Sequence, residues 1–226
     1  MNKEAKLNFI RNFPLFSVLT EAERHQMADY MEFQEKPKYR DIYQPGQSSA
    51  EIYFLAKGAV KTGTHSHDGK EVIKSIIHPL SMFGELGLIG ETQRTEFAQA
   101  MKENVHVYVV RVEQFQQLMR QNFDLCNRVM MLFGNRLMNA EHKLESLVFK
   151  DARTRIVEFI KDSMEHRGQR VGFEMLLKHS LTHQDIANIT CTSRQTVTLV
   201  LNELRKSDLI YFNRGRILVR DMARLA

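Results

Sequence analysis

The 226-residue sequence predicts an α+β fold with three parts: an N-terminal β-roll, a long helix and a C-terminal winged helix-turn-helix. Three patterns predict it. Short apolar runs alternate with turns over residues 39–112, a heptad seam covers residues 126–147, and two capped helical segments precede a β wing over residues 181–221. We expect the boundaries of the three parts to be 1–112, 113–148 and 149–226.

Residues 39–112 contain the strand-like runs "EIYFLA", "AVKTGT", "EVIKSII" and "HVYVVRV". The turn signals between the runs are Pro45-Gly46, Lys57-Gly58, Asp68-Gly69 and His78-Pro79. Asp68-Gly69 predicts a two-residue hairpin, and "TEAE" over residues 20–23 predicts a helix start. Many short strands at regular spacing favour a β-roll or barrel.

A long helix is predicted from apolar residues whose spacing alternates between four and three. These residues are Cys126, Met130, Phe133, Leu137, Ala140, Leu144 and Leu147. Such a seam is narrower than the face that a helix normally buries in its own domain. We therefore expect the helix to pair with its copy in a homodimer. The alternative is a helix that is buried within its own chain.

The C-terminal segment predicts two short helices and a wing. Thr182 and Asp185 have the spacing of a helix-capping pair, and Ser193 can cap a second helix. One face of the second helix is apolar and consists of Val197, Val200, Leu201 and Leu204. "LIYF" and "RILVR" then flank an Asn213–Arg216 turn. This pattern is typical of a winged helix-turn-helix; the alternative is a small helical packing domain.

The polar face of this segment has side chains that can read DNA. We expect DNA contacts from Thr182, Gln184, Ser193, Arg194, Gln195, Thr198, Leu199 and Asn202. Arg can bind the O6 and N7 edge of guanine, Gln can pair with adenine, and Leu can meet a thymine methyl. Three further arginines, Arg214, Arg216 and Arg220, are expected to contact phosphates.

Charge and cysteine content agree with a DNA partner and a cytoplasmic location. The net charge is +5, of which residues 151–226 contribute +4 through 13 Lys and Arg against 9 Asp and Glu. A basic C-terminal third favours a polyanionic partner. Two isolated cysteines without a CxxC motif predict no disulfide framework, metal or iron–sulfur cluster. No apolar run approaches the ~20 residues that span a bilayer, so no membrane partner is expected.

At this point the chain resembles the CRP/FNR family of bacterial transcription regulators over nearly its full length. "TSRQTVTLVLNELRKSDLI" resembles that family's recognition helix, and "FGELGLIGETQRT" resembles the phosphate-binding cassette of cyclic-nucleotide-binding domains. The resemblance implies a double-stranded β-helix for the effector domain and a homodimer on pseudo-palindromic DNA. It also implies RNA polymerase as a partner and cAMP or another cyclic nucleotide as the effector.

The resemblance gives the cassette a physical interpretation. Gly84 would let the backbone approach a ligand, and Glu85 would accept a hydrogen bond from a ribose 2′-hydroxyl. The short helix that contains Leu86 would direct N–H groups at a phosphate. Arg94 would bind that phosphate through a forked pair of bonds, and the Thr95 hydroxyl would add another.

The cassette departs from the family pattern in ways that keep an alternative open. Glu96 follows Thr95 where the family usually has a small residue, and Ala140 and Glu141 replace adenine-contacting hydroxyls on the long helix. The alternative is a constitutive regulator whose vestigial pocket contains an internal Glu85–Arg94 ion pair. A further alternative is a cyclic-nucleotide module that regulates a partner protein without binding DNA.

An enzymatic function is a weaker alternative. His65, His67 and Glu71 have the spacing of a cupin metal motif, which would indicate a metalloenzyme. The Asp68-Gly69 turn interrupts that motif, and no second motif follows it. No catalytic triad or Walker string is present, and the β-rich portion has no cysteine for a cluster. We therefore expect no enzyme activity and no metal, haem or iron–sulfur cluster.

Overall fold

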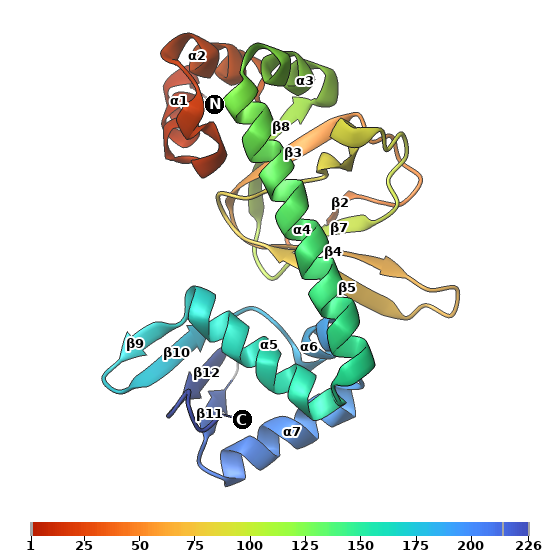
Figure 1. Ribbon diagram of the computed structural model, residues 1–226, viewed down its shortest axis with the longest axis vertical. Helices are drawn as coiled ribbons and strands as arrows, with labels where there is room; N and C mark the ends of the chain where they lie inside the picture. Colours follow the sequence, from red (N-terminus) through yellow and green to blue (C-terminus); the bar gives the residue numbers. More distant parts are fainter. Residues whose placement is uncertain (1, 214, 226) are drawn as a thin grey trace. The chain divides into compact units, whose positions relative to one another are not determined.

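The computed structural model describes residues 2–213 and 215–225, and it confirms the predicted α+β architecture (Figure 1). The chain divides into two compact units. Unit 1 consists of residues up to Gly69 together with Lys74–Met138, and unit 2 consists of Lys70–Ile73 together with the residues from Asn139 onward. In the described chain, no helix combines the length and the apolar character needed to cross a membrane.

The β-roll contains two four-stranded sheets. The first has the order β1 (Glu32–Lys36), β8 (Val105–Arg111), β3 (Glu51–Lys57), β6 (Met82–Phe83). The second has the order β2 (Asp41–Tyr43), β7 (Phe97–Ala100), β4 (Val60–His65), β5 (Glu71–Ile77). Five residues separate β4 from β5, so the predicted two-residue hairpin is wrong. A backbone bond from Gly69 to Ser66 (3.0 Å) closes a turn within this longer loop.

Successive side chains of strand β3 belong alternately to two separate hydrophobic cores. In β3, Ile52 and Phe54 belong to one buried cluster, while Tyr53 and Leu55 belong to the other. Since successive side chains of a strand point to opposite faces, β3 is buried on both sides. Its nearly continuous apolar sequence follows from this position in the roll.

The first of these cores also contains the short helices of unit 1. They are α1 (Lys3–Asn12), η1 (Pro14–Val18), α2 (Glu21–Tyr30) and α3 (Val112–Gln121). The ring of Phe54 contacts those of Phe13 and Phe16, with centroid separations of 5.4 and 5.1 Å. The predicted helix start over residues 20–23 is confirmed, because Thr20 and Glu23 form a capping box at α2.

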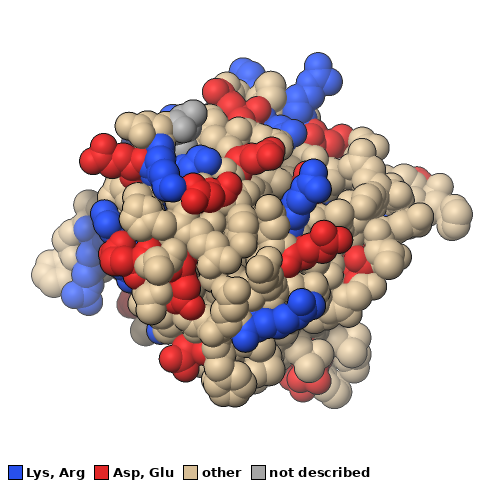
Figure 2. Space-filling view, turned by 90° about the horizontal axis from the view of Figure 1, so that it is seen from above, with Lys and Arg blue, Asp and Glu red and all other residues tan. Residues whose placement is uncertain are grey.

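Charged side chains of both signs are interspersed on the face shown in Figure 2. Ion pairs in the N-terminal helices of unit 1 include Lys3–Asp29 (2.6 Å) and Arg24–Glu21 (2.9 Å). This face therefore has no broad field of one sign, which agrees with the small net charge of the first 150 residues.

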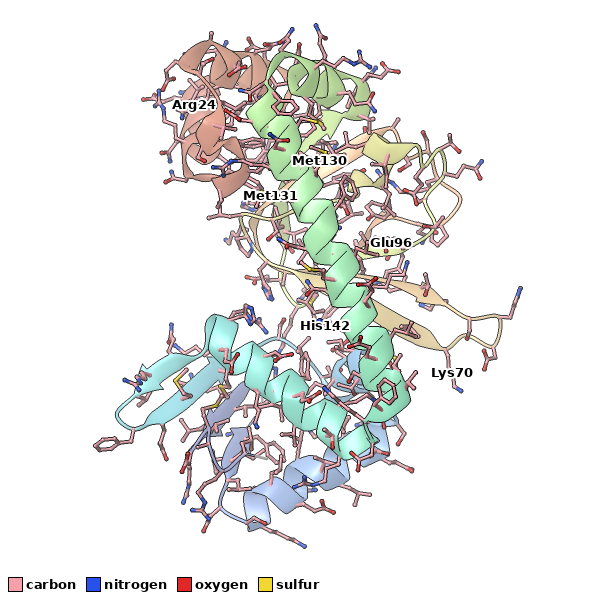
Figure 3. All side chains as sticks on the ribbon, viewed as in Figure 1. Arg24, Lys70, Glu96, Met130, Met131 and His142 are labelled. Atoms are coloured by element: carbon pink, nitrogen blue, oxygen red, sulfur yellow. The ribbon has the colours of Figure 1, made fainter. Side chains whose placement is uncertain are left out.

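Helix α4 (Phe123–Phe149) is the predicted long helix, and it has 27 residues. Its first turns bury Leu125 and Val129 in the core of unit 1. Farther along, the apolar side chains face solvent: Leu137 is 62% exposed and Leu144 is 63% exposed. Met130 and Met131, which Figure 3 marks on α4, are also exposed. Most of the predicted seam is thus not covered by the described chain.

Unit 2 is the winged helix-turn-helix. Its helices are α5 (Ala152–Arg167), α6 (His183–Thr190) and α7 (Arg194–Lys206). Its sheet has the order β11 (Ile210–Asn213), β12 (Arg216–Val219), β10 (Glu174–Lys178), β9 (Gln169–Val171), and every pairing is antiparallel. Arg155 of α5 donates to the carbonyls of Thr190 and Cys191 at the end of α6, at 3.0 and 3.3 Å. It thereby satisfies carbonyl groups that a helix end leaves unpaired.

Candidate functional site

The turn after β6 requires glycine at position 84. Gly84 has a φ of +69°, in the left-handed region that favours glycine. A Cβ atom there would lie 3.0 Å from Nη1 of Arg94 and 3.0 Å from the Tyr53 ring. Gly84 therefore permits both the turn and the close approach of Arg94. The 3₁₀ helix η2 (Glu85–Ile89) begins at the next residue.

Arg94 is buried, with 3% of its surface exposed. Its Nη1 donates to the carbonyl oxygen of Gly84 at 2.7 Å, and its Nη2 donates to the carbonyl oxygen of Glu51. The guanidinium carbon lies 4.3 Å from the ring centroid of Tyr43, a cation–π contact. Its Nε is a buried donor that has no hydrogen-bond partner among the described residues.

Glu85 is buried as deeply, with 2% exposed, but its partner is Arg136 of α4 and not Arg94. Nη1 of Arg136 donates to Oε1 of Glu85, and Nη2 donates to the carbonyl oxygen of Met82 at 2.7 Å. The internal Glu85–Arg94 ion pair of the vestigial-pocket alternative is therefore wrong. Burial raises the pKa of Glu85, and the Arg136 charge opposes that rise only in part. Oε2 of Glu85 has no partner in the described chain.

Thr95 and Leu86 serve the cassette turn itself. The Thr95 hydroxyl donates to Oε1 of Glu91 at 2.8 Å, and its backbone N–H donates to the same oxygen at 3.1 Å. Ser49 donates to the other oxygen of Glu91 at 2.7 Å. The carbonyl of Leu86, a half-buried residue, accepts from the Glu91 N–H at 3.1 Å. The hydroxyl expected to bind phosphate thus has an internal acceptor, Glu91.

The carboxylate nearest to Arg94 is that of Glu91, whose Oε2 lies 3.9 Å from Nη1 of Arg94. Glu96, which is marked in Figure 3, instead contacts Tyr43 and Lys74. Its Oε1 accepts from the Tyr43 hydroxyl at 3.4 Å, and its Oε2 lies 3.2 Å from Nζ of Lys74. Burial and the nearby Glu96 charge raise the pKa of Tyr43. Tyr43 therefore contacts both the Glu96 carboxylate, through its hydroxyl, and the Arg94 guanidinium, through its ring.

Two buried side-chain atoms of the cassette have no hydrogen-bond partner among the described residues. Oε2 of Glu85 is a buried acceptor, and Nε of Arg94 is a buried donor. Buried polar groups normally have hydrogen-bond partners. A hydroxyl donor would satisfy the first atom and an anionic acceptor would satisfy the second, and the ribose and phosphate of a cyclic nucleotide are groups of these two kinds.

The sequence missed Arg136, Tyr43 and Lys74 as members of this pocket. Arg136 is 51 positions from Glu85 along the chain, so no local spacing relates them. The only sequence signal for Arg136 is its place on the flank of the heptad seam, where a guanidinium is ordinarily a solvated charge. A single Tyr or Lys on a strand gives no signal of this kind.

In unit 2 the predicted helix caps are confirmed. Oγ1 of Thr182 accepts from the backbone N–H of Asp185 at 3.1 Å, and Oδ2 of Asp185 accepts from the N–H of Thr182 at 2.8 Å. Oγ of Ser193 accepts from the N–H of Thr196 at 3.0 Å. Because both caps are exposed hydroxyl residues at helix starts, they lie where a phosphate oxygen can also approach.

The remaining DNA-contact candidates share the outer side of α7 or the start of α6. Arg194, Gln195 and Leu199 are exposed, and Leu199 is 63% exposed. Thr198 and Asn202 are half-buried beside them. The inner residues Val197, Val200, Leu201 and Leu204 are all buried, as predicted. On α6, Gln184 is exposed and its side-chain amide donates to Asn188 at 2.8 Å.

The candidate phosphate contacts lie on or near the wing. Arg216 is exposed at the start of β12, and Nη1 of Arg220 lies 3.5 Å from Oδ1 of Asp208. Arg214 lies outside the described residues. Among the described residues, no group of three His, Cys, Asp or Glu side chains is arranged to hold a metal ion.

Comparison with known proteins agrees with this geometry. Residues 34–122 match the cyclic nucleotide-binding domain, and residues 154–226 match the Crp-like helix-turn-helix domain. The chain is 28% identical over 181 residues to the global nitrogen regulator of a Nostoc species, covering 80% of this chain and 81% of that protein. It is 26% identical over 216 residues to the cyclic AMP receptor protein of Thermus thermophilus, covering 96% of each.

The structure of FixK2 from Bradyrhizobium japonicum has the same fold, with a TM-score of 0.77 over 86% of this chain and 95% of that one, at 20% identity. A β-roll with a ligand cassette, followed by a winged helix-turn-helix, defines a class of DNA-binding transcription regulators. The chain belongs to the CRP/FNR family within that class.

Proposed function

We propose that the chain is a homodimeric transcription regulator whose DNA binding is controlled by a cyclic nucleotide such as cAMP. The observation that carries the effector assignment is the pair of buried, unpartnered atoms, Oε2 of Glu85 and Nε of Arg94. A ribose hydroxyl would donate to the first, and the cyclic phosphate would accept from the second. The relatives support this class of ligand, since one is named a cyclic AMP receptor protein.

The dimer assignment rests on α4. Of the 17 large apolar side chains that are exposed in the described chain, 9 lie on this helix. Burying them against a second copy would remove a large apolar area from water. Two winged helices in one dimer would then read half-sites about one helical turn (~34 Å) apart, which requires a pseudo-palindromic DNA site.

Arg136 supplies a route from effector to dimer. It lies on the seam helix and donates to Glu85. A ligand hydroxyl that binds Glu85 would therefore change the strength of the hydrogen bond between Glu85 and Arg136. Effector binding would thereby bias the position of the dimer helices and the spacing of the reading heads. This coupling is allosteric only if effector and DNA alter each other's affinity by the same factor.

The partners and the location follow from this function. We propose RNA polymerase as a further protein partner, the cytoplasm as the location, and no catalytic activity. The predicted division into residues 1–112, 113–148 and 149–226 is our proposal for the effector, dimerisation and DNA-binding parts.

Calorimetry with cAMP and cGMP tests the effector assignment. We expect the unmodified protein to bind one of them, and Arg94→Gln to abolish the heat of binding because it removes the charge opposite the phosphate. Arg111→Gln, an exposed arginine at the end of β8, is the matched control and should bind as the unmodified protein does. Tight DNA binding without heat from either nucleotide contradicts the cyclic-nucleotide assignment.

One observation favours a second candidate, a constitutive regulator with a vestigial pocket. The Thr95 hydroxyl already donates to Glu91, and the Glu96 carboxylate lies beside Tyr43 and Lys74. These polar side chains of the cassette therefore have partners within the protein. Arg94→Ala separates the candidates. A ligand-controlled protein loses its response to the effector, whereas a constitutive one binds DNA as before.

A further inference from the structure

A hydrogen-bond chain connects the two helices of the reading head. His183, the first residue of α6, has its Nδ1 3.0 Å from Oγ1 of Thr198 on α7. The same oxygen donates to the backbone carbonyl of Arg194, one turn earlier on α7, at 2.9 Å. Thr198 lies on the side of α7 that also carries Gln195, Leu199 and Asn202, which are the candidate base contacts.

Counting protons shows which group donates in each of these two hydrogen bonds. A threonine hydroxyl has one proton, and that of Thr198 is used toward the Arg194 carbonyl. The hydroxyl must then accept from His183, so the Nδ1 of His183 carries a proton and donates. Burial and the Arg194 charge lower the pKa of His183, so the neutral ring with this tautomer prevails at pH 7.

The imidazole is also held from the side of the wing. The Phe212 ring of β11 lies 5.9 Å from the His183 ring, centroid to centroid, at 60°. Phe212 in turn lies beneath Arg205 of α7, at 5.1 Å from its guanidinium carbon. Contacts from α7 and β11 thus hold His183, and His183 fixes the orientation of the Thr198 side chain.

We propose that His183 is a positioning residue that makes Thr198 read the 5-methyl group of thymine in duplex DNA. With its proton committed to Arg194 and one lone pair to His183, the hydroxyl has no donor left for the O4 acceptor of thymine, so the Cγ2 methyl is what Thr198 offers to a thymine. An apolar group in the major groove favours the thymine methyl, whereas a free hydroxyl bonds to several base edges. The proposal rests on the proposed function only in that α7 is taken to read DNA.

Two neighbouring residues, Thr198 and Leu199, would contact thymine methyl groups, and only Thr198 would depend on His183. Leu199 offers a thymine methyl an apolar contact that does not involve His183. Thr198 offers the same kind of contact only while His183 holds its hydroxyl. Removing His183 should therefore change the reading of one base position and leave a position read by Leu199 unaltered.

The test uses the full-length protein and a half-site selected from random duplex DNA. Each thymine is replaced in turn by deoxyuridine, which removes only the 5-methyl group, and affinity is measured by fluorescence anisotropy. We expect the unmodified protein to bind about fourfold more weakly when the thymine read by Thr198 loses its methyl, the effect of one buried carbon. His183→Ala should lose this discrimination at that position alone.

Two variants distinguish positioning from general distortion. His183→Asn keeps a donor close to the place of Nδ1 and should retain the discrimination. The double variant His183→Ala, Thr198→Val presents a methyl group in any orientation, so it should regain the discrimination that His183→Ala loses. If His183→Ala keeps the fourfold effect, or if the double variant fails to restore it, the proposal is overturned.

A failure of the proposed function would look different. Absence of binding to any duplex at low salt contradicts the DNA-reading role itself and overturns both. If the protein binds tightly but no replacement of thymine by deoxyuridine changes the affinity, only the role of His183 and Thr198 is overturned.

Discussion

Arg136 of the long helix donates a hydrogen bond to Glu85 of the ligand cassette, and these two residues connect the elements with the two proposed roles. The second oxygen of Glu85 is buried and unpartnered in the described chain. If a ligand hydroxyl binds this oxygen, as we propose, the ligand acts directly on a side chain that α4 already binds.

Arg136→Ala should lower the free energy of unfolding by about 1–3 kcal/mol, because it leaves a buried carboxylate without its donor. The loss of stability stays in this range because the Arg136 side chain is 39% exposed and water can reach it. Urea unfolding followed by circular dichroism measures the change. Arg128→Ala removes an exposed α4 arginine that donates to the Pro14 carbonyl at 2.9 Å, and it should cost less than half as much.

Glu85 should make stability fall as pH rises. Its pKa in the folded state lies above the ordinary value of 4.5, so the folded protein holds this proton more tightly than the unfolded chain does. The resulting stabilisation is complete below the unfolded pKa and is lost as pH rises through the folded pKa. Glu85→Gln has no such proton to lose and should gain stability relative to the unmodified protein as the pH rises above 4.5.

Urea unfolding of both proteins at several pH values measures that difference. A difference that is independent of pH, or that has the opposite slope, contradicts the raised pKa of Glu85.

Glu96→Gln should tighten cyclic-nucleotide binding. Its carboxylate lies beside Tyr43, against which Arg94 stacks, and a bound phosphate near Arg94 would be repelled by it. Because this repulsion is removed, we expect about three- to tenfold tighter binding in calorimetry. Glu103→Gln changes an exposed carboxylate in the turn before β8 and should leave the affinity unaltered. Weaker binding by Glu96→Gln would instead place a ligand donor at this carboxylate.

Leu137→Glu should break the dimer. This seam residue is 62% exposed in the single chain, and a homodimer would bury two copies of it. Loss of both apolar contacts should weaken association by about two orders of magnitude or more. Asn135→Glu adds the same charge at an exposed position away from the seam and should stay dimeric. Analytical ultracentrifugation compares the three proteins, and a Leu137→Glu protein as dimeric as the control would exclude this seam.

The sequence predicted best the features that depend on residues a few positions apart. The capping pair Thr182–Asp185 and the Ser193 cap are such features, and both are present. The inward face of α7 followed from its helical spacing, and the long helix followed from its heptads. β1 was missed because "EFQEK" has no clear apolar alternation, and pairing with β8 holds it in place.

The ligand cassette was predicted in outline, but the partners of its side chains were not. Arg94 does bond to Gly84, yet Glu85 pairs with Arg136, a residue 51 positions away, because the fold brings α4 across the cassette. Thr95 illustrates a local competition: Glu91, four residues earlier, accepts the hydroxyl that a ligand phosphate would also use. Such choices depend on tertiary packing and on ligand occupancy, which no spacing encodes.

Measurement of DNA affinity with and without effector tests the central claim most directly. Fluorescence anisotropy with a selected pseudo-palindromic duplex would be carried out at fixed salt, with cAMP and cGMP in turn, for the unmodified protein and for Arg136→Ala. We expect one nucleotide to change the DNA affinity of the unmodified protein at least tenfold, and Arg136→Ala to reduce that factor. An affinity that neither nucleotide changes would contradict control of DNA binding through Glu85 and Arg136.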